Sequence, residues 1–328
     1  YPSACEVGPG TMVSDDLVFL NYEYSCVSFR VAETKLGQQL FLGNNIYFPS
    51  SESIGDNCLL ASKVMLPIDA QRRSDIGLLG SPAFEIPRRN SNDVAFNPVP
   101  QDAEGYARLL SKNFYNLRTM GIYLFCNWLA VFMGFLAGYI LLSIFDQVST
   151  LSLVASGLAL FFGAAPIYII SERLSLSGNR LKPYECTIHD PYFWWIERHW
   201  KLAETPFKYI FRGTPFRPWM HRILGIEMGK RVFDDGAFAT EKTLTVIEDD
   251  VCLNAEVSIQ AHSLEDGLFK SDRIVIGAGS SVGPLAYIHY GAILGRNTEI
   301  APDSFVMKGT NTKSHSIWCG NPARVVNG

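Results

Sequence analysis

Three kinds of feature are scarce or missing in this sequence, and each absence excludes a class of protein. Only 18% of the 328 residues are charged and the formal net charge is -4, so the chain has no general basic surface for nucleic acid. The seven cysteines include no CxxC or CxxxxC pair, which argues against a zinc site and a disulfide framework and is typical of a reducing compartment. No signal peptide is apparent. Because the chain opens with Tyr1, close to a running repeat, we expect a fragment whose upstream part is missing.

Charged side chains are absent from two long stretches, 119–145 and 147–171. Each stretch exceeds the roughly 20 residues that cross a bilayer core as a helix. We therefore predict two transmembrane helices, joined at Asp146 in a tight hairpin. The alternative is a pair of buried helices in a large soluble core, although few soluble helices are apolar on every face for so long.

Basic residues flank these two stretches: Arg108, Lys112 and Arg118 come before the first, and Arg173, Arg180 and Lys182 follow the second. The positive-inside bias places both flanks in the cytoplasm. The chain is therefore predicted to be a multi-pass protein of a lipid bilayer, with the segments on either side of the hairpin in the cytosol.

A six-residue period runs through the last part of the chain. Its aliphatic positions are Ile276, Val282, Ile288, Leu294, Ile300 and Val306, and glycines follow three of them at Gly277, Gly283 and Gly295. This period is neither helical nor a strand alternation. It is the signature of a parallel β-helix, in which each short strand forms one side of a coil and one aliphatic residue per side points into the core. The predicted fold class is mainly β, with left-handed parallel β-helix (hexapeptide repeat) domains.

The same period occurs a second time, at Leu36, Leu42, Phe48, Ile54, Leu60 and Leu66. Each run closes with a similar turn, Gly80-Ser81-Pro82-Ala83 in one and Gly320-Asn321-Pro322-Ala323 in the other. The chain therefore carries an internal duplication. We predict a first β-helix over 1–100, a helix and two transmembrane helices over 101–175, an aromatic and basic segment over 176–222, and a second β-helix over 223–328.

The segment before the second β-helix mixes aromatic rings with cationic side chains. They are Trp194, Trp195, Trp200, Phe207, Tyr209, Phe211, Phe216 and Trp219, among Arg198, Lys201, Lys208, Arg212, Arg217 and Arg222. This mixture suits the headgroup layer of a bilayer, so we predict interfacial helices interrupted at Pro206, Pro215 and Pro218. The alternative is an ordinary helix packed on the β-helix.

Histidine is missing from the chain before His189. The first β-helix therefore cannot perform histidine-dependent acid-base chemistry with its own side chains, and its break after Leu66 offers Asp69, Arg72, Arg73 and Asp75 instead. We predict that it serves as a scaffold or as a binding half.

The second β-helix departs from its period at one place. Ile247, Leu253 and Ile259 are in phase, but the next hexad position is Glu265 and the phase resumes only at Ile276. A loop that leaves a β-helix costs regular packing and usually marks a site or a contact. His262 lies at the start of this loop.

His262 is the predicted general base, because histidine is well suited to take a proton near neutral pH when a neighbour fixes its tautomer. Glu265 and Asp266 are close enough in sequence to be that neighbour. The alternative is a surface histidine in a polar loop. His289, flanked by Tyr287 and Ile288 on one side and Tyr290 on the other, either takes part directly or packs against a neighbouring coil.

Three polar residues of the second β-helix, Asp234, Asn254 and Asp272, are candidate contacts to substrate. Asp234 can hold an amine or hydroxyl of an acceptor, and Asn254 can donate a hydrogen bond to it. Asp234 and Asn254 are equally compatible with a role as turn residues, because Asp, Asn and Gly are favoured in turns for local reasons.

A metal site is not predicted. Zinc needs three or four close ligands, and the γ-type carbonic anhydrases, which are β-helix enzymes that bind zinc through three histidines, have two of them five positions apart. His262, His289 and His315 contain no such pair, and His315 is expected to lie on the surface.

The stretch from about 224 to 326 resembles the hexapeptide-repeat acyltransferases of the maltose and galactoside acetyltransferase type. In that family an extended loop follows a general-base histidine and leads into an IGxxxxIG run, which corresponds here to His262, the loop 264–273 and Ile276-Gly277. The acceptor-binding aspartate of that family corresponds to Asp234. Soluble acetyltransferases have neither the membrane hairpin nor a tandem second copy.

A second resemblance covers the whole chain. The run from His262 to Asp272, together with Ile288-His289-Tyr290-Gly291, the segment 303–309 and Gly320-Asn321-Pro322-Ala323-Arg324, is similar to the terminal region of membrane-bound amino-acid homopolymer synthetases of the ε-poly-L-lysine type. These are related to nonribosomal peptide synthetases (NRPS-like). In that family adenylation and carrier domains precede membrane helices that are interleaved with three acyltransferase-like domains.

The resemblance implies an acyltransferase that moves an aminoacyl group from a carrier-protein thioester, on its phosphopantetheine arm, to an amino-acid or peptide acceptor amine. His262 would take the proton of the amine and no cofactor would be tightly bound. The β-helix domains would pack as a pseudo-trimer, within one chain or between chains. Two alternatives stay open: a membrane O- or N-acetyltransferase that uses CoA, and a non-catalytic membrane scaffold that docks carrier domains.

Overall fold

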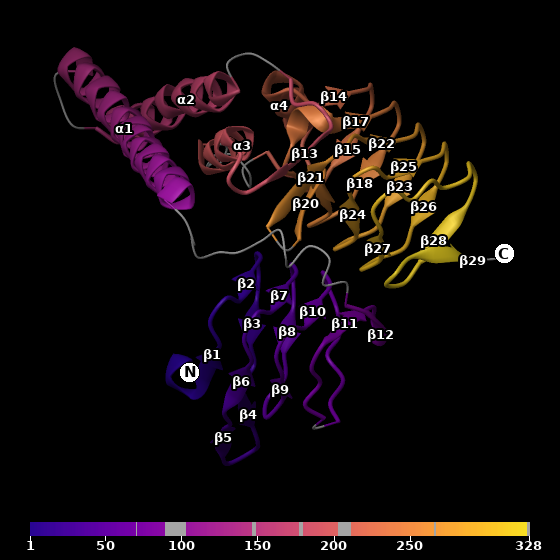
Figure 1. Ribbon diagram of the computed structural model, residues 1–328. Coiled ribbons are helices and arrows are strands. Elements are labelled where there is room, and N and C mark those ends of the chain that lie inside the picture. Colours follow the sequence, from indigo (N-terminus) through magenta and orange to yellow (C-terminus); the bar gives the residue numbers. More distant parts are fainter. Residues whose placement is uncertain are drawn as a thin grey trace.

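The computed structural model describes residues 1–69, 71–88, 103–145, 149–176, 180–202, 211–265 and 267–326. Two regions of short, mostly parallel strands are separated along the chain by two long helices (Figure 1). We call residues 5–87 the first β region and residues 227–326 the second β region.

The second β region is a stack of coils with three sides. Successive coils add one strand to each of three sheets, in the orders β14-β17-β22-β25, β15-β18-β23-β26-β28-β29 and β16-β19-β24-β27. All neighbours are parallel except β28 and β29. The strands of these sheets are β14 (Glu227–Met228), β15 (Phe233–Asp234), β16 (Phe238–Ala239), β17 (Thr245–Ile247), β18 (Cys252–Leu253), β19 (Ser258–Gln260), β22 (Ile274–Ile276), β23 (Ser281–Val282), β24 (Tyr287–His289), β25 (Ile293–Leu294), β26 (Glu299–Ile300), β27 (Phe305–Val306), β28 (Ile317–Cys319) and β29 (Arg324–Val326).

The six-residue period produces this stack because one side chain per strand faces the interior. The hexad residues from Ile276 to Val306 are almost completely buried, and each buried aliphatic side chain contributes about 1.5–3 kcal/mol. Close stacking of the coils explains a glycine: a Cβ atom at Gly283 would lie 2.5 Å from the backbone nitrogen of Pro302. The predicted parallel coils are thus present, while the hand of the coil stays a prediction.

The first β region repeats this plan. Its strands form the sheets β1-β6-β9, β2-β7-β10-β11-β12 and β3-β8, with a separate hairpin of β4 and β5. The two regions align without a gap, with Tyr22 at the place of His262 and Leu36 at the place of Ile276, and the second region has one additional coil, β14 to β16. The elements are η1 (Pro2–Ala4), β1 (Cys5–Val7), β2 (Met12–Val13), β3 (Val18–Phe19), β4 (Tyr22–Tyr24), β5 (Phe29–Val31), β6 (Thr34–Leu36), β7 (Phe41–Leu42), β8 (Tyr47–Phe48), β9 (Ser53–Ile54), β10 (Leu59–Leu60), β11 (Ile76–Leu79) and β12 (Phe84–Pro87).

Two long helices occupy the middle of the chain, α1 (Ala103–Phe145) and α2 (Thr150–Ser175). Both are long and apolar enough to cross a membrane, judged by length and composition. The helix α2 begins at Ser149, which exchanges hydrogen bonds with Ser152 in a capping box. Large apolar side chains of both helices are exposed, including Phe125, Ile144 and Leu151, which does not fit the alternative of buried helices in a soluble core. Asp146, the predicted hairpin residue, lies outside the described residues.

A strand and two short helices connect α2 to the second β region: β13 (Tyr184–Thr187), α3 (Pro191–Leu202) and α4 (Phe216–Leu224). Phe193 and Trp194 of α3 are buried in the core of the second β region. For α3 the predicted position in the headgroup layer is therefore wrong, because its aromatic face packs on the coil. Phe216 and Trp219 of α4 are exposed, and Pro206, Phe207, Lys208 and Tyr209 lie outside the described residues.

The two β regions pack against each other beside α1 (Figure 1). Leu79 of the first region forms a small apolar cluster with Tyr287 and Phe305 of the second. Lys63 donates a hydrogen bond to the backbone oxygen of Leu285 (2.8 Å) and pairs with Asp303. This packing places a face of the first region opposite His262 and His289.

Candidate active site

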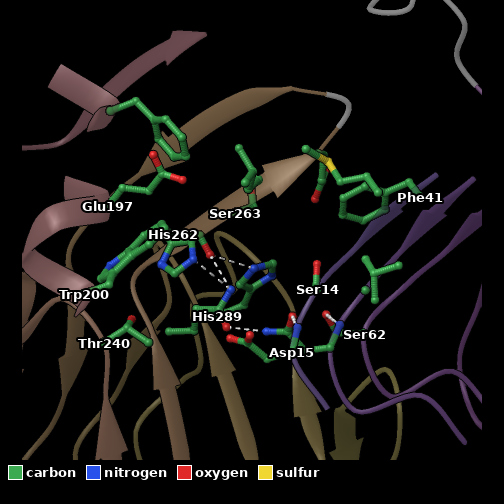
Figure 2. Close-up of a pocket in the computed structure, with 18 of the residues that line it drawn as sticks. Ser14, Asp15, Phe41, Ser62, Glu197, Trp200, Thr240, His262, Ser263 and His289 are labelled. Atoms are coloured by element: carbon green, nitrogen blue, oxygen red, sulfur yellow. Dashed lines mark hydrogen bonds between the residues drawn. The ribbon is translucent and has the colours of Figure 1, made fainter. Parts of the chain in front are cut away.

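A cavity of about 1050 Å³ lies between the two β regions, α1 and α3 (Figure 2). The first region contributes polar and apolar wall residues, including Ser14, Asp15, Phe41, Asn44 and Ser62. Residues of α1 from Asn116 to Tyr123 and residues of α3 from Phe193 to Lys201 line another side. The second region contributes His262 and His289. Both predicted histidines therefore line one cavity.

His262 lies where the chain leaves the regular coil. After β19 the chain forms the hairpin of β20 (His262–Glu265) and β21 (Leu268–Ser271), and β13 pairs with β21 as a third antiparallel strand. His262 is the first residue of β20, so the coil fixes its backbone while its side chain reaches the cavity. The side chain is 13% exposed.

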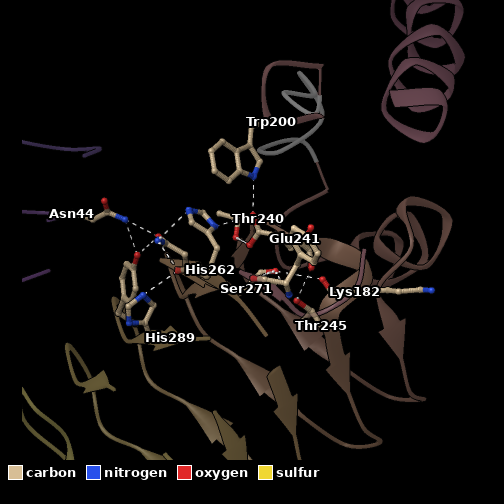
Figure 3. Close-up of polar contacts among 12 residues, drawn as sticks. Asn44, Lys182, Trp200, Thr240, Glu241, Thr245, His262, Ser271 and His289 are labelled. Atoms are coloured by element: carbon tan, nitrogen blue, oxygen red, sulfur yellow. Dashed lines mark hydrogen bonds and ion pairs between the residues drawn. The ribbon is translucent and has the colours of Figure 1, made fainter. Parts of the chain in front are cut away.

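The nearest carboxylate to the imidazole belongs to Glu241. Nδ1 of His262 lies 2.8 Å from Oε1 of Glu241 (Figure 3), an ion-pair contact rather than a linear hydrogen bond, since Nδ1 meets no hydrogen-bond criterion. Glu241 is completely buried and also accepts a hydrogen bond from Nε1 of Trp200 (2.7 Å) and one from the Thr240 hydroxyl. Burial acts to raise the pKa of Glu241, but the contacts with His262, Thr240 and Trp200 outweigh it and lower that pKa. Glu241 is therefore a carboxylate that orients the imidazole.

The prediction that Glu265 or Asp266 orients His262 is wrong for Glu265. Both carboxylate oxygens of Glu265 accept hydrogen bonds from Nζ of Lys308, each at 3.0 Å, because the hairpin carries this residue away from the imidazole. Asp266 lies outside the described residues. The sequence does contain a signal for Glu241: it stands one hexad before Ile247, at a position where the period calls for an aliphatic side chain.

Two aromatic rings hold the imidazole in place. The ring of Trp200 in α3 stacks on His262 at 4.5 Å between centroids, and Phe269 of β21 lies on it at 5.7 Å. Phe269 is completely buried and also contacts Phe193. Since α3 supplies both Trp200 and Phe193, this helix positions the histidine as well as packing on the coil.

His289 lies behind His262 on the neighbouring coil. Its Nε2 donates a hydrogen bond to the backbone oxygen of His262 (3.0 Å), and its ring packs on Tyr287, Tyr290 and Phe305. Burial, together with nearby His262 and Lys308, lowers the pKa of His289 to about 3. The ring is therefore neutral at physiological pH, and its geometry is that of a support for His262.

The three predicted substrate contacts do not line the cavity. Asp234 is buried, accepts hydrogen bonds from the backbone of Gly236 and Ala237, and lies 3.0 Å from Nε2 of His221. The Asn254 side chain donates to the backbone oxygen of Val282, and Asp272 is exposed and accepts from the next backbone nitrogen. These polar groups serve the coil and its turns, so the prediction that they bind substrate at this cavity is wrong.

The cavity offers proton-transfer chemistry. His262, with Glu241 behind it and a ring stacked on either face, can take a proton from a nucleophile in the cavity. Within the described residues no group of three or more His, Cys, Asp or Glu side chains is placed to hold a metal ion. Asp69 and Arg73, which the break in the first region brings together as an ion pair, lie outside this cavity.

No protein-family model matches the chain. The chain is 26% identical to delta-poly-L-ornithine synthetase of Acinetobacter baumannii (strain AB307-0294) over 331 residues, which include 98% of the chain. It is thus a distant homologue of part of an amino-acid homopolymer synthetase, which confirms the resemblance inferred from the motifs. The chain spans 24% of the length of that synthetase.

Solved structures of hexapeptide-repeat acetyltransferases are also similar to part of the chain. A maltose O-acetyltransferase from Clostridium difficile 630 is 16% identical with a TM-score of 0.34, covering 48% of this chain and 96% of that one. A galactoside acetyltransferase in complex with coenzyme A is 17% identical with a TM-score of 0.30, covering 34% and 68%. These scores do not indicate the same overall structure.

Proposed function

We propose that this chain is an acyltransferase that moves an aminoacyl group from a carrier-protein thioester to an acceptor amine. The observation that carries the proposal is the His262–Glu241 pair, which faces a cavity built by both β regions. The kinship to a homopolymer synthetase supports an amino-acid donor and acceptor. A volume of about 1050 Å³ is large enough for the end of a phosphopantetheine arm and an amino acid together.

The proposed reaction is one displacement at the thioester carbonyl. The amine nitrogen attacks the carbonyl carbon and a C–N bond forms. His262 takes the proton that the amine loses, the C–S bond breaks, and the protonated imidazole returns the proton to the leaving thiolate. Glu241 stabilises the transient imidazolium, as a carboxylate behind a catalytic histidine does. Since a thioester is already activated, positioning and one proton transfer supply most of the catalysis.

We further propose that α1 and α2 cross a bilayer as a hairpin and leave both β regions in the cytosol. The exposed apolar side chains of these helices support this, as do the basic residues at their ends. Both ends of the hairpin are tied to the segment before the second β region, because Lys112 pairs with Glu197 and Glu172 pairs with Lys242. The cavity includes Met120 and Tyr123 at the start of the first uncharged stretch, so it lies near the expected bilayer surface.

In this proposal the first β region acts as the second wall of the site, and the two regions pack like members of a pseudo-trimer. The packing is not reciprocal: Tyr287 is buried against the first region, whereas Tyr47, its counterpart there, is exposed. Contacts of this heterologous kind build rings of repeated units. Tyr287→Glu should expose the interface to protease and Tyr47→Glu should not; equal effects would contradict the proposed packing.

The proposed function is tested by presenting the purified protein in lipid nanodiscs with an aminoacyl-loaded carrier protein and a free amino-acid acceptor. Amide formation should occur and should fall by about 10²- to 10⁴-fold in His262→Ala. His315→Ala, a surface control in a turn, should not change it. Amide formation that persists in His262→Ala contradicts the proposal. Transfer from free acyl-CoA but not from the carrier would indicate the CoA-dependent alternative, and carrier binding without any transfer would indicate a scaffold.

A further inference from the structure

A side chain of the first β region contacts the polar residues beside His262. Nδ2 of Asn44 donates hydrogen bonds to Oε1 of Gln260 (2.6 Å) and to the Tyr287 hydroxyl (2.7 Å), both in the second region (Figure 3). Tyr287 donates its own hydroxyl proton to Oε1 of Gln260. Gln260 in turn lies next to the imidazole, with its Nε2 3.4 Å from Nε2 of His262.

The direction of each amide in this chain follows from partners that have only one role. The backbone nitrogen of Asp15 donates to Oδ1 of Asn44 (3.3 Å), so the Nδ2 group of Asn44 must face Gln260. At the other end, Nε2 of Gln260 lies 3.2 Å from the backbone oxygen of His262. A carbonyl oxygen can only accept, so the NH₂ group of Gln260 must face His262.

This orientation has a chemical consequence for the imidazole. Nδ1 of His262 faces the buried Glu241 and therefore carries the proton of the neutral ring. Nε2 then faces an N–H group and keeps its lone pair, which is the form that a general base needs. If the Gln260 amide turned over, its oxygen would face Nε2 and would favour the protonated ring instead.

We propose that Asn44 is a positioning residue by which the first β region holds the Gln260 amide with its NH₂ group toward His262 and so keeps His262 in its unprotonated, reactive form. The proposal rests on His262 being the base of the proposed function. It gives the first region, which has no histidine, a part in the chemistry beyond forming a wall.

Other charged and titratable groups also face this imidazole or line the cavity around it, and they stay unchanged in the test. From the elements packed against His262 these are Glu241, His289, Glu265 with Lys308, Glu197, Arg198, Lys201, Lys242 and, in the first region, Asp15. A change in the pKa of His262 on substitution of the uncharged Asn44 therefore cannot arise from a change in net charge.

The test measures the pKa of His262 by NMR of the full-length protein with labelled histidine, in nanodiscs and without substrate, using His262→Ala to assign the signal. In Asn44→Ala the Gln260 amide is free to turn over, and the pKa of His262 should rise by about one unit. The acid limb of the pH–rate profile should rise with it. Transfer should then be about tenfold slower well below that pKa and nearly unchanged well above it.

Gln38→Ala, which removes an exposed amide of the first region, is the matched control and should leave the pKa of His262 unchanged. If Asn44→Ala does not fold, Tyr287→Phe removes the second donor to Gln260 and should shift the pKa in the same direction. Gln260→Glu should raise it further. An unchanged pKa in a folded Asn44→Ala protein, or an equal loss of rate at every pH, would overturn the proposal. Persistent transfer by His262→Ala would instead contradict the proposed function and leave this pKa measurement valid.

Discussion

The two β regions have the same plan but differ in what covers the equivalent hairpin. In the first region the hairpin of β4 and β5 pairs with no other strand among the described residues, and Phe29 is 62% exposed. In the second region the counterpart, Phe269, is completely buried beneath α3, and β13 extends the hairpin to three strands. Where Tyr22 stands in the first hairpin, His262 stands in the second.

The difference teaches that the coil alone does not make the site. The second region gains Trp200 from α3 and has Glu241 in the turn between its first two coils, whereas the position equivalent to Glu241 in the first region is Tyr1. A histidine at a hairpin becomes a base when a buried carboxylate and a stacked ring restrict it. The segment that precedes the coil is therefore as important for the chemistry as the repeat.

The largest expected effect is on the carboxylate behind the histidine. Glu241→Gln keeps the size of the side chain but removes the charge that stabilises the imidazolium, so transfer should fall by about 10²-fold or more, mainly in kcat. The comparison variant Glu265→Gln removes the carboxylate that pairs with Lys308 and should cost much less. Steady-state kinetics with a loaded carrier measures both. A greater loss in Glu265→Gln would mean that the carboxylates have been assigned in the wrong order.

The hairpins differ next in stability. Phe269→Ala should lower the free energy of unfolding by about 3–5 kcal/mol, because it leaves a cavity among aromatic rings. Phe29→Ala, at the equivalent exposed place, should change it by about 0.5 kcal/mol or less. Denaturant unfolding of both variants in the same detergent measures the difference. Similar values for the two would show that the first hairpin is also covered in solution.

Acid should weaken the second region before the first. Burial lowers the pKa of His289 to about 3 and the pKa of His199 to about 4, below the ordinary value of about 6.5 in the unfolded chain. The unfolded state then binds more protons, so the stability that these rings contribute is complete above about pH 6.5 and declines as the pH falls toward the folded values. Limited proteolysis at about pH 5 should cut the second region first, and His289→Gln should reduce that sensitivity. Equal resistance of the second region at about pH 7.5 and at about pH 5 would contradict this.

The smallest expected effect tests whether the first region can be made reactive. Tyr22→His, placed in the inactive His262→Ala protein, should restore no measurable transfer, because neither a buried carboxylate nor an α3 tryptophan is available at that hairpin. The amide-forming assay with a loaded carrier measures this. Recovery of transfer would show that the repeat and its hairpin suffice.

Much of the fold was predictable because its pattern is local. A period of six places aliphatic residues such as Ile276 and Val282 in the core wherever the coil lies, and the absence of charge in α1 and α2 is visible in composition alone. The break of phase likewise indicates His262. The partners of His262 were harder to predict, because Trp200, Glu241 and Asn44 come together only through packing between distant segments.

The same limit explains the errors. Nearness in sequence favoured Glu265 as the partner of His262, but strand pairing in the hairpin turns this carboxylate toward Lys308. Composition placed α3 in the headgroup layer, although its rings fill the side of the coil. An acidic residue on an inward hexad position, as at Glu241, is the kind of local inconsistency that marks a site in a repeat.

The most direct measurement is the single-turnover rate of amide formation from an aminoacyl carrier thioester, with Tyr22→Ala and His262→Ala compared in otherwise identical proteins. We predict a rate close to that of the unsubstituted protein for Tyr22→Ala and a loss of at least about 10²-fold for His262→Ala. Equal losses at the two equivalent positions, or no loss at His262, would contradict the conclusion that one hairpin of the pair carries the chemistry.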